Sequence, residues 1–171
     1  MPPNPPQDST IDDQFGFIDW TNKIVLDLYT QEGQTSFYFV EKGAKIIYAF
    51  EMGEFNTTRP IIKASPYSSK IFLRWCNFLN KHEMIKLLIE IKPTIVKCDW
   101  RYNWEVLRTI EKQYFGLSPE YIFKLRAQGQ VNNLETILTK QGYHIDTRKD
   151  LSDCIMIYAK QDSNWSPIEN P

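Results

Sequence analysis

Short apolar runs alternate with helical patterns along most of the chain, and this alternation restricts the possible folds more than any other feature. The apolar runs, nearly continuous as expected of strands covered on both faces, lie at 23–29, 44–51, 94–100 and 121–126. Helical patterns lie at 34–42, 103–115 and 131–142. Gly43 and Gly142 stand where two of these helices are expected to end. The alternation predicts an α/β sandwich with a mostly parallel sheet.

The remaining segments are assigned to the same sheet and to the helices that cover it. Residues 59–64 are predicted as a weak strand at a sheet edge, because Pro60 cannot donate to a central ladder. Residues 68–92 are predicted to be mostly helical, with a break near Asn80. Residues 143–147 and 154–160 are predicted to close the sheet as an antiparallel strand pair.

The length of 171 residues corresponds to one domain, since a single core begins to split only beyond ~250 residues. We expect an α/β domain at 19–160, between a flexible acidic tail at 1–18 and a second flexible tail at 161–171. The start of the sequence lacks the basic and apolar segments of a signal peptide, and no apolar run approaches the ~20 residues that cross a bilayer. These observations predict a cytoplasmic protein with no membrane partner.

Charge and cysteine usage restrict the function classes further. The formal net charge of the chain is −1, but it is unevenly distributed. Six of the 21 acidic residues lie outside residues 23–160, whereas all 20 basic residues lie within them, so the segment 23–160 has a formal charge of +5. The three cysteines, Cys76, Cys98 and Cys154, lie far apart and form no pair at metal-ligand spacing. They are predicted to be buried thiols in a reducing compartment, and no metal site is expected.

Two strand ends carry residues suited to a nucleotide ligand. In open parallel sheets, ligands bind beyond the carboxyl ends of the strands. Asp27 and Gly33 flank the turn between the first strand and its helix, where a glycine lets the backbone approach a ligand. Glu51 ends the second strand, and an acid at that place can accept hydrogen bonds from both ribose hydroxyls. Taken alone, these residues fit a helix entry turn and a solvated acid better than a ligand site.

The segment 22–51, NKIVLDLYTQEGQTSFYFVEKGAKIIYAFE, resembles the opening of FkbM-type class I methyltransferases. Their pattern is roughly K-V-V-L-D-x-G-A-N-x-G-x-T-S-x-Y-F-A-x-x-G-A-K-x-V-x-A-x-E. The matching positions are Lys23, Val25, Leu26, Asp27, Gly33, Thr35, Ser36, Tyr38, Phe39, Gly43, Ala44, Lys45, Ala49 and Glu51. A second family block, K-x-D-C-E-G-x-E-x-x-L, is matched in outline at 97–107. The resemblance extends from about residue 19 to residue 160.

This resemblance implies a Rossmann-like class I methyltransferase sandwich that binds S-adenosylmethionine (SAM). It implies that Asp27 and Gly33 lie near the methionine part of the cofactor and that Glu51 holds the ribose. Asp99 keeps its place in the second block and is the candidate base or acceptor-positioning group, with helix capping or pairing to Arg101 as the structural alternative. The resemblance also implies a hydroxyl acceptor on a small molecule or a glycan.

The departures from the family pattern affect the same site. Tyr29 stands at the first glycine of the family, and Arg101 and Tyr102 replace its Glu-Gly. Lys124 and Arg126 stand where the family has an acid and a histidine. The helix that usually follows Glu51 is predicted to be missing or reduced to 53–59.

Three functions are therefore considered. The first is a SAM-dependent O-methyltransferase with a divergent cofactor loop. The second is a catalytically inactive methyltransferase-like domain that binds a protein partner or regulates a homologue. The third is a nucleic-acid-binding module that uses the basic and aromatic residues of the pocket, which a pI near 6.1 disfavours.

Overall fold

The computed structural model describes residues 9–77, 80–99 and 117–163, and in this part of the chain seven strands form one mixed sheet. The strands are β1 (Ile24–Leu28), β2 (Ile46–Glu51), β3 (Ile71–Trp75), β4 (Ile95–Asp99), β5 (Glu120–Leu125), β6 (Tyr143–Asp150) and β7 (Ile155–Gln161). Their order is β3-β2-β1-β4-β5-β7-β6. The pairs from β3 to β5 are parallel, whereas β7 pairs antiparallel with both β5 and β6. This topology confirms the predicted α/β sandwich with an antiparallel C-terminal pair.

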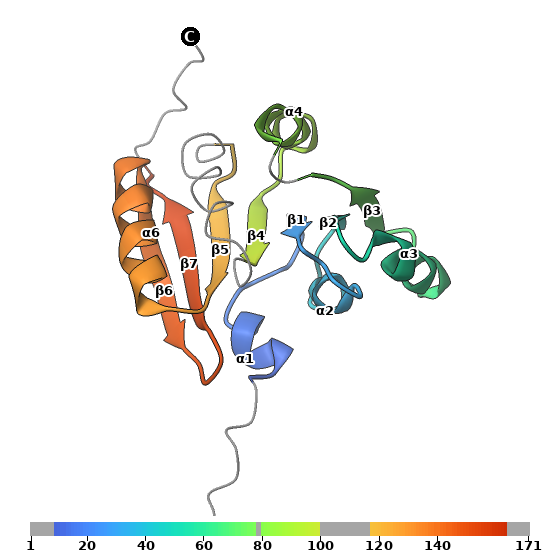
Figure 1. Cartoon of the computed structure of the whole chain (residues 1–171), viewed down its shortest axis with the longest axis horizontal. Helices are drawn as coiled ribbons and strands as arrows, with labels where there is room; N and C mark the ends of the chain where they lie inside the picture. Colours follow the sequence, from blue (N-terminus) through green and yellow to red (C-terminus); the bar gives the residue numbers. More distant parts are fainter. Residues whose placement is uncertain (1–8, 78–79, 100–116, 164–171) are drawn as a thin grey trace, which may run out of the picture.

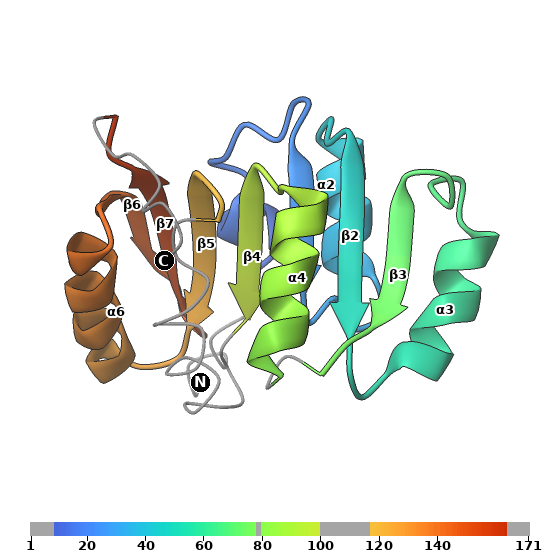
Figure 2. The same ribbon diagram turned by 90° about the horizontal axis from the view of Figure 1, so that it is seen from above.

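Helices cover both faces of the sheet (Figures 1 and 2). They are α1 (Ile11–Phe15), α2 (Gln34–Glu41), α3 (Phe55–Ala64), α4 (Lys81–Ile91) and α6 (Gln128–Lys140). One buried cluster joins α4 and α6 to the sheet, and a second joins α1, α2 and α3 to the opposite face. None of the helices in the described ranges is long and apolar enough to cross a membrane.

The N-terminal segment belongs to the fold, which corrects the expected tail at 1–18 for residues 9–18. Helix α1 is held by a capping box, in which Thr10 and Asp13 exchange side-chain and backbone hydrogen bonds. Phe15 is fully buried, and its ring meets that of Phe39 edge-on at 5.3 Å. Trp20 stacks on the same Phe39 ring at 4.0 Å. Burial of these large rings repays the entropy of ordering a segment whose composition is polar.

Two predicted elements between β2 and α4 are wrong. Residues 59–64 are not a strand but the second half of α3. The helix after Glu51, predicted to be missing or reduced to 53–59, is therefore present with 10 residues. Pro60 is tolerated on the exposed side of this helix, while Thr58 and Ile62, four positions apart, face inward. Residues 71–75, predicted to be helical, form the edge strand β3. Asn80 marks the predicted break, because its side chain accepts from Glu83 N and caps α4.

The other predicted elements lie where the sequence placed them. Strands β1, β2, β4, β5, β6 and β7 and helices α2, α4 and α6 fall within or next to their expected ranges. The helix expected at 103–115 lies outside the described residues. The three cysteines are buried free thiols, as predicted.

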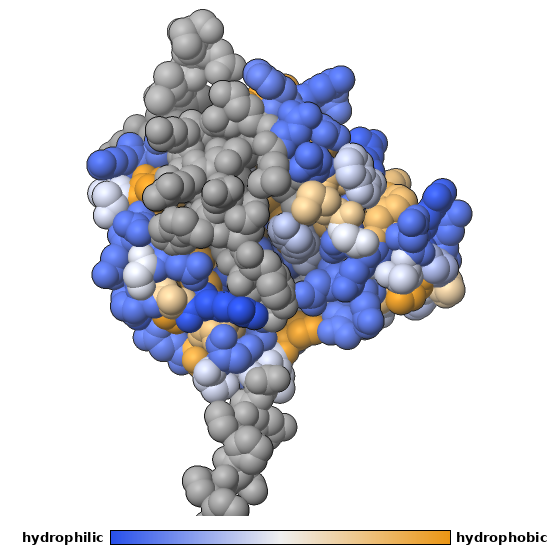
Figure 3. Space-filling model, viewed as in Figure 1, coloured by the Kyte–Doolittle hydropathy of each residue, from blue (hydrophilic) through white to orange (hydrophobic). Residues whose placement is uncertain are grey.

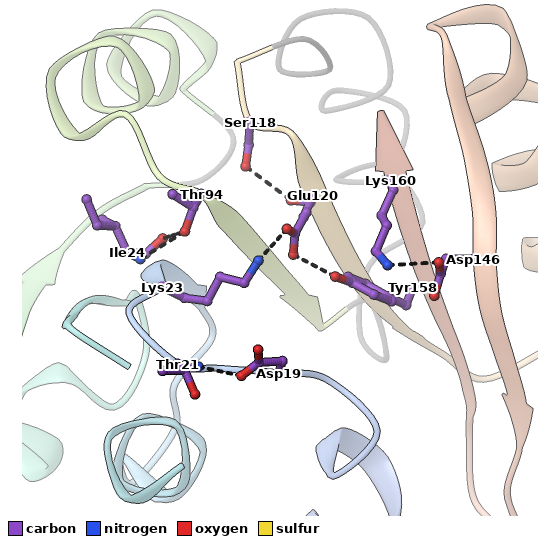
Figure 4. Close-up of polar contacts among 10 residues, drawn as sticks. All are labelled: Asp19, Thr21, Lys23, Ile24, Thr94, Ser118, Glu120, Asp146, Tyr158 and Lys160. Atoms are coloured by element: carbon purple, nitrogen blue, oxygen red, sulfur yellow. Dashed lines mark hydrogen bonds and ion pairs between the residues drawn. The ribbon is translucent and has the colours of Figure 1, made fainter. Parts of the chain in front are cut away.

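A polar network ties β1, β5 and β7 together at the start of β1 and β5 (Figure 4). The ammonium of Lys23 forms an ion pair with Glu120, and Tyr158 donates to the same carboxylate at 2.6 Å. Burial and this hydrogen bond to Glu120 raise the pKa of Tyr158 well above its ordinary value. The network lies away from the ends of the parallel strands where ligands are expected, so its role is to brace the sheet.

The apolar surface exposed by large side chains is concentrated at the β3 side of the molecule. Phe72 and Trp75 on β3 are 46% and 54% exposed, and Ile61 on the neighbouring α3 is 43% exposed. Figure 3 shows orange and pale apolar surface in this region, between α4 and α3, next to blue hydrophilic surface. The carboxyl ends of the central strands are instead lined by charged side chains.

Candidate functional site

Asp27 organises the junction between β1 and α2. Its carboxylate is completely buried, and Oδ2 accepts hydrogen bonds from Thr35 Oγ1 at 2.8 Å and Ser36 Oγ at 2.7 Å. Both hydroxyls belong to the first turn of α2. The aspartate and the Thr-Ser pair of the family pattern therefore act as one unit, which fixes the start of the helix against the strand.

Lys97, on β4, completes the surroundings of this carboxylate. It is the register partner of Asp27, and its Nζ lies 3.0 Å from Asp27 Oδ1. The same ammonium donates to the carbonyl oxygens of Leu28 at 3.1 Å and Tyr29 at 2.9 Å. A buried ammonium is tolerated here because it is paired and hydrogen-bonded. Lys97 thus links β4 to the loop that follows β1.

The loop after β1 has a left-handed backbone at alternate residues, with φ of 61° at Tyr29, 53° at Gln31 and 89° at Gly33. Left-handed conformations cost residues with a Cβ roughly 1–2 kcal/mol. This loop therefore keeps a backbone suited to glycine while carrying two large side chains. The missing Cβ of Gly33 would lie 3.3 Å from Ile62 Cγ1 and 3.4 Å from the Phe37 ring, so this glycine allows close packing against α3 and α2.

Glu51 holds the loop from the other side. Its Oε1 accepts from the backbone N–H groups of Met52 at 2.8 Å and Gly53 at 3.0 Å, with Glu54 at 3.4 Å. Its Oε2 accepts from Gln31 N at 2.9 Å, which joins the ends of β1 and β2. The carboxylate is only 3% exposed. Much of its hydrogen-bonding capacity is thus used within the chain.

A cavity of about 230 Å³ lies between the β1–α2 loop, the ends of β4 and β5, and the N-terminal segment. Its walls include Asp99 on β4 and Lys124 on β5, which are register partners and are 6% and 5% exposed. Tyr29 and Gln31 line the cavity from the loop, and Gln14 lines it from α1. The cavity therefore brings Tyr29 and Gln31, whose backbones are left-handed, together with buried side chains of both charges.

Two carboxylates, at the ends of β2 and β4, act on the Tyr29 phenol. Burial raises the pKa of this phenol, and the charges of Glu51 and Asp99 raise it further. The ammonium of Lys97 lies on the other side of the charge balance, because it donates to the Tyr29 carbonyl oxygen and also lines the cavity.

The sequence-predicted residues take different places around this site. Asp99 lines the cavity, whereas Asp27, Gly33 and Glu51 support the loop behind its wall. Lys124 is buried while Arg126 is exposed, and Arg101 and Tyr102 lie outside the described residues.

Sequence reasoning missed the roles of Lys97, Gln14 and Asp153. For Lys97 a signal existed, because a polar residue two positions before Asp99 must face the same side of the strand. Gln14 reaches the cavity from a segment expected to be a tail, and Asp153 lies in the β6–β7 connection. No sequence pattern connects these two residues to the sheet ends.

Several solved methyltransferases share this fold. The magnesium protoporphyrin IX methyltransferase ChlM from Synechocystis, solved with bound SAM, matches at a TM-score of 0.65 and 13% identity, over 84% of this chain and 72% of that chain. TrmK from M. capricolum, solved with S-adenosyl-homocysteine (SAH), matches at a TM-score of 0.66 and 16% identity, over 86% of this chain and 66% of that chain. The ribosomal protein L11 methylase from Lactobacillus delbrueckii subsp. bulgaricus matches at a TM-score of 0.64 and 16% identity, over 83% of this chain and 71% of that chain.

These likenesses define the class of the fold: the chain has the Rossmann-like fold of SAM-dependent methyltransferases. At such low identities they show the fold alone. No protein-family model and no curated protein matches the sequence. The likeness to FkbM-type enzymes in particular therefore stays a prediction.

Proposed function

We propose that this chain is a SAM-dependent methyltransferase whose cofactor binds at the carboxyl ends of β1, β2 and β4. The observation that carries the proposal is the Glu51 carboxylate, which is almost fully buried at the end of β2 and accepts from Gln31 N of the loop that lines the cavity with Tyr29. An acid at the end of this strand can accept hydrogen bonds from the ribose hydroxyls of a nucleotide. When bound, SAM supplies an activated methyl group.

The carboxylate of Glu51 retains capacity for a ligand. Among the described residues, its Oε2 accepts one hydrogen bond, from Gln31 N, and a carboxylate oxygen can accept two. A ribose hydroxyl is a suitable second donor. The bonds from Gln31, Met52 and Gly53 hold this carboxylate in a fixed orientation before any ligand arrives.

The finer assignment concerns the acceptor. Asp99 lines the cavity beside the Tyr29 loop and is the carboxylate placed to orient an acceptor hydroxyl and take its proton. Lys97 holds the loop that forms the neighbouring wall. With the FkbM-type resemblance, this arrangement supports O-methylation of a small molecule or a glycan.

The test is ligand-induced thermal stabilisation by SAH, the demethylated product. Binding to the folded state at 100 times the Kd stabilises it by about 2.7 kcal/mol. We expect a clear rise in Tm for the wild type and a much smaller rise for Glu51→Gln, each compared with its own ligand-free Tm. Glu54→Gln, which changes an exposed acid three residues away, is the matched control and should keep the full rise. A wild type with no rise at millimolar SAH would contradict the proposal.

A second candidate, a binding or regulatory domain without methyl transfer, has one specific observation in its favour. The chain itself already occupies much of the polar capacity at the site: Asp27 is held by Thr35, Ser36 and Lys97, and Glu51 by backbone N–H groups. Thermal stabilisation by SAH without methyl transfer to any hydroxyl acceptor would favour this candidate. Transfer that Asp99→Asn abolishes, while SAH binding persists, would favour the enzyme.

A further inference from the structure

We infer that the sheet face formed by β2 and β3 beside α4 binds single-stranded nucleic acid. Bases stack on Phe72 and Tyr48, and phosphates pair with Lys70 and Arg74. None of these four residues lines the cavity beside the β1–α2 loop, so the inference stands apart from the proposed function. It concerns the apolar region at the β3 side of the molecule (Figures 2 and 3).

Two stacked rings form the centre of this surface. Tyr48 on β2 and Phe72 on β3 are register partners, and their ring centroids lie 5.6 Å apart at an interplanar angle of 24°. Tyr48 packs against the buried cluster that joins α4 to the sheet, whereas Ile71 and Leu73 pack in the cluster on the opposite face. Phe72, which lies between these two residues, therefore points to the α4 side of the sheet, where it is 46% exposed.

The rings are open because α4 covers only part of this face of the sheet. In Figure 2, viewed from the side of α4, this helix lies between β4 and β2, and no described helix lies over β3. The large apolar side chains that are exposed among the described residues all lie on α3, β3 and α4: Ile61, Phe72, Trp75 and Ile89. An exposed ring on a sheet can stack with a nucleobase of any sequence, because every base has a π face.

Cations flank the rings along the strand. Lys70 and Arg74 lie two residues before and two residues after Phe72, so strand alternation places all three on one face. The ladder already includes Lys70, whose carbonyl oxygen accepts from Ile47 N at 2.9 Å. Both cations are exposed, and neither side chain forms a hydrogen bond or ion pair with another described residue. They are therefore available to phosphates of a strand whose bases stack next to them.

The charge around this surface has one sign. Residues 55–82 contain no aspartate or glutamate and are the longest such stretch in a chain with 21 acidic residues. Arg59 and Lys63 on α3 add two more exposed cations. The net charge of −1 for the whole chain therefore conceals a basic surface at this end of the sheet.

This charge favours a polyanion over a second copy of the chain. A twofold interface places the same patch on both subunits, so it would bring like charges together here. The exposed rings further favour a single strand over a duplex, because the bases of a duplex are already stacked on one another and cannot stack on side chains.

Fluorescence anisotropy with a labelled oligouridylate of about ten nucleotides, within the site sizes of single-strand binders, tests the inference. The wild type should bind it more tightly than a duplex of the same length. Phe72→Leu removes the ring but keeps an apolar side chain, and it should lower the affinity about tenfold, whereas Phe72→Trp should retain binding. Phe37→Leu, which removes a ring from α2 on the opposite face, is the matched control and should change nothing.

The salt dependence of binding tests the two cations. Lys70→Gln and Arg74→Gln should each weaken binding at low salt and reduce the slope of log K against log salt by about 0.7, as expected for one phosphate contact to a single strand. Lys140→Gln, which changes an exposed cation on α6, should leave the slope unchanged. The urea midpoint of each variant verifies that the fold is intact.

Heparin and vesicles containing phosphatidylserine serve as polyanions without bases. If they bind while the oligouridylate does not, the surface recognises charge alone and the inference is overturned. Equal affinity of Phe72→Leu and the wild type for the oligouridylate would also overturn it. So would a wild-type dimer that Phe72→Leu dissociates, because a second copy would then cover this face. Stabilisation by SAH is measured separately, so failure of the proposed function would leave this result unaffected.

Discussion

The ammonium of Lys97 lies 3.0 Å from Asp27 Oδ1 and 2.9 Å from the carbonyl oxygen of Tyr29. The two side chains of this ion pair are 1% and 0% exposed. One buried cation therefore neutralises the acid at the end of β1 and fixes the strained loop beside it. The shape of the candidate site depends on this contact between adjacent strands.

Replacing Lys97 with methionine should destabilise the fold strongly. The substitution leaves the Asp27 carboxylate buried without its counter-ion, and breaking a buried pair from one side costs about 3–5 kcal/mol. Urea denaturation of Lys97→Met measures this loss. The exposed Lys45→Met should lose less than about 0.5 kcal/mol. A loss below about 1 kcal/mol for Lys97→Met would contradict the structural role of the pair.

Gln31→Gly should stabilise the protein. The backbone of Gln31 is left-handed, and its two hydrogen bonds, to Glu51 and from Thr58, use main-chain atoms that glycine keeps. Relief of ~1–2 kcal/mol of strain exceeds the ~0.4–1 kcal/mol entropy cost of glycine, so a gain of about 0.5–1 kcal/mol is expected. The same change at Gln34, in the first turn of α2, should instead cost about 1 kcal/mol. Equal losses in both variants, measured by thermal unfolding, would show that the loop is not strained.

Glu120→Gln should weaken the brace across β1, β5 and β7. The carboxylate holds both Lys23 and Tyr158, and the Lys23 and Glu120 side chains are 21% and 16% exposed. Because solvent screens this pair in part, we expect a loss of about 1–2 kcal/mol in urea denaturation. The exposed Glu32→Gln serves as control. An unchanged stability of Glu120→Gln would argue against the brace.

Stability should fall at alkaline pH. Burial and the hydrogen bond to Asp12 raise the pKa of Tyr38 from 10.0 to about 12. Because the folded state holds this proton more tightly, the stabilisation is complete below pH 10 and is lost as the pH rises toward 12. From pH 8 to pH 11 this tyrosine accounts for a loss of about 1 kcal/mol.

Urea denaturation at the two pH values measures this effect. Tyr38→Phe should lose correspondingly less stability over the interval than the wild type, while Tyr158, whose pKa is also raised, still contributes. An identical loss in wild type and Tyr38→Phe would assign the alkaline sensitivity to other groups.

The sequence predicted the central sheet well because its strands are buried on both faces. Such strands have continuous apolar runs, which distinguish β1, β2, β4 and β5 from helices. The edge strand β3 lacks this signal, since Phe72 and Trp75 are exposed and its apolar run continues toward α4. In α3, Pro60 pointed to an edge strand, although the exposed side of a helix also tolerates it.

The site was predictable only where its residues lie in contiguous motifs. Asp27 and Glu51 stand at strand ends and were recognised as site candidates. The part of the cavity made by Gln14 and Asp153 depends on long-range packing of an N-terminal segment that looks disordered by composition. Local patterns carry no information about such contacts.

A crystal structure of the protein grown with SAH tests the central claim most directly. We predict a bound nucleoside at the carboxyl ends of β1 and β2, with its ribose hydroxyls on the Glu51 carboxylate and its sulfur on the side of the cavity that Asp99 lines. A protein that binds no SAH at millimolar concentration, or binds it away from Tyr29 and Glu51, would contradict the account.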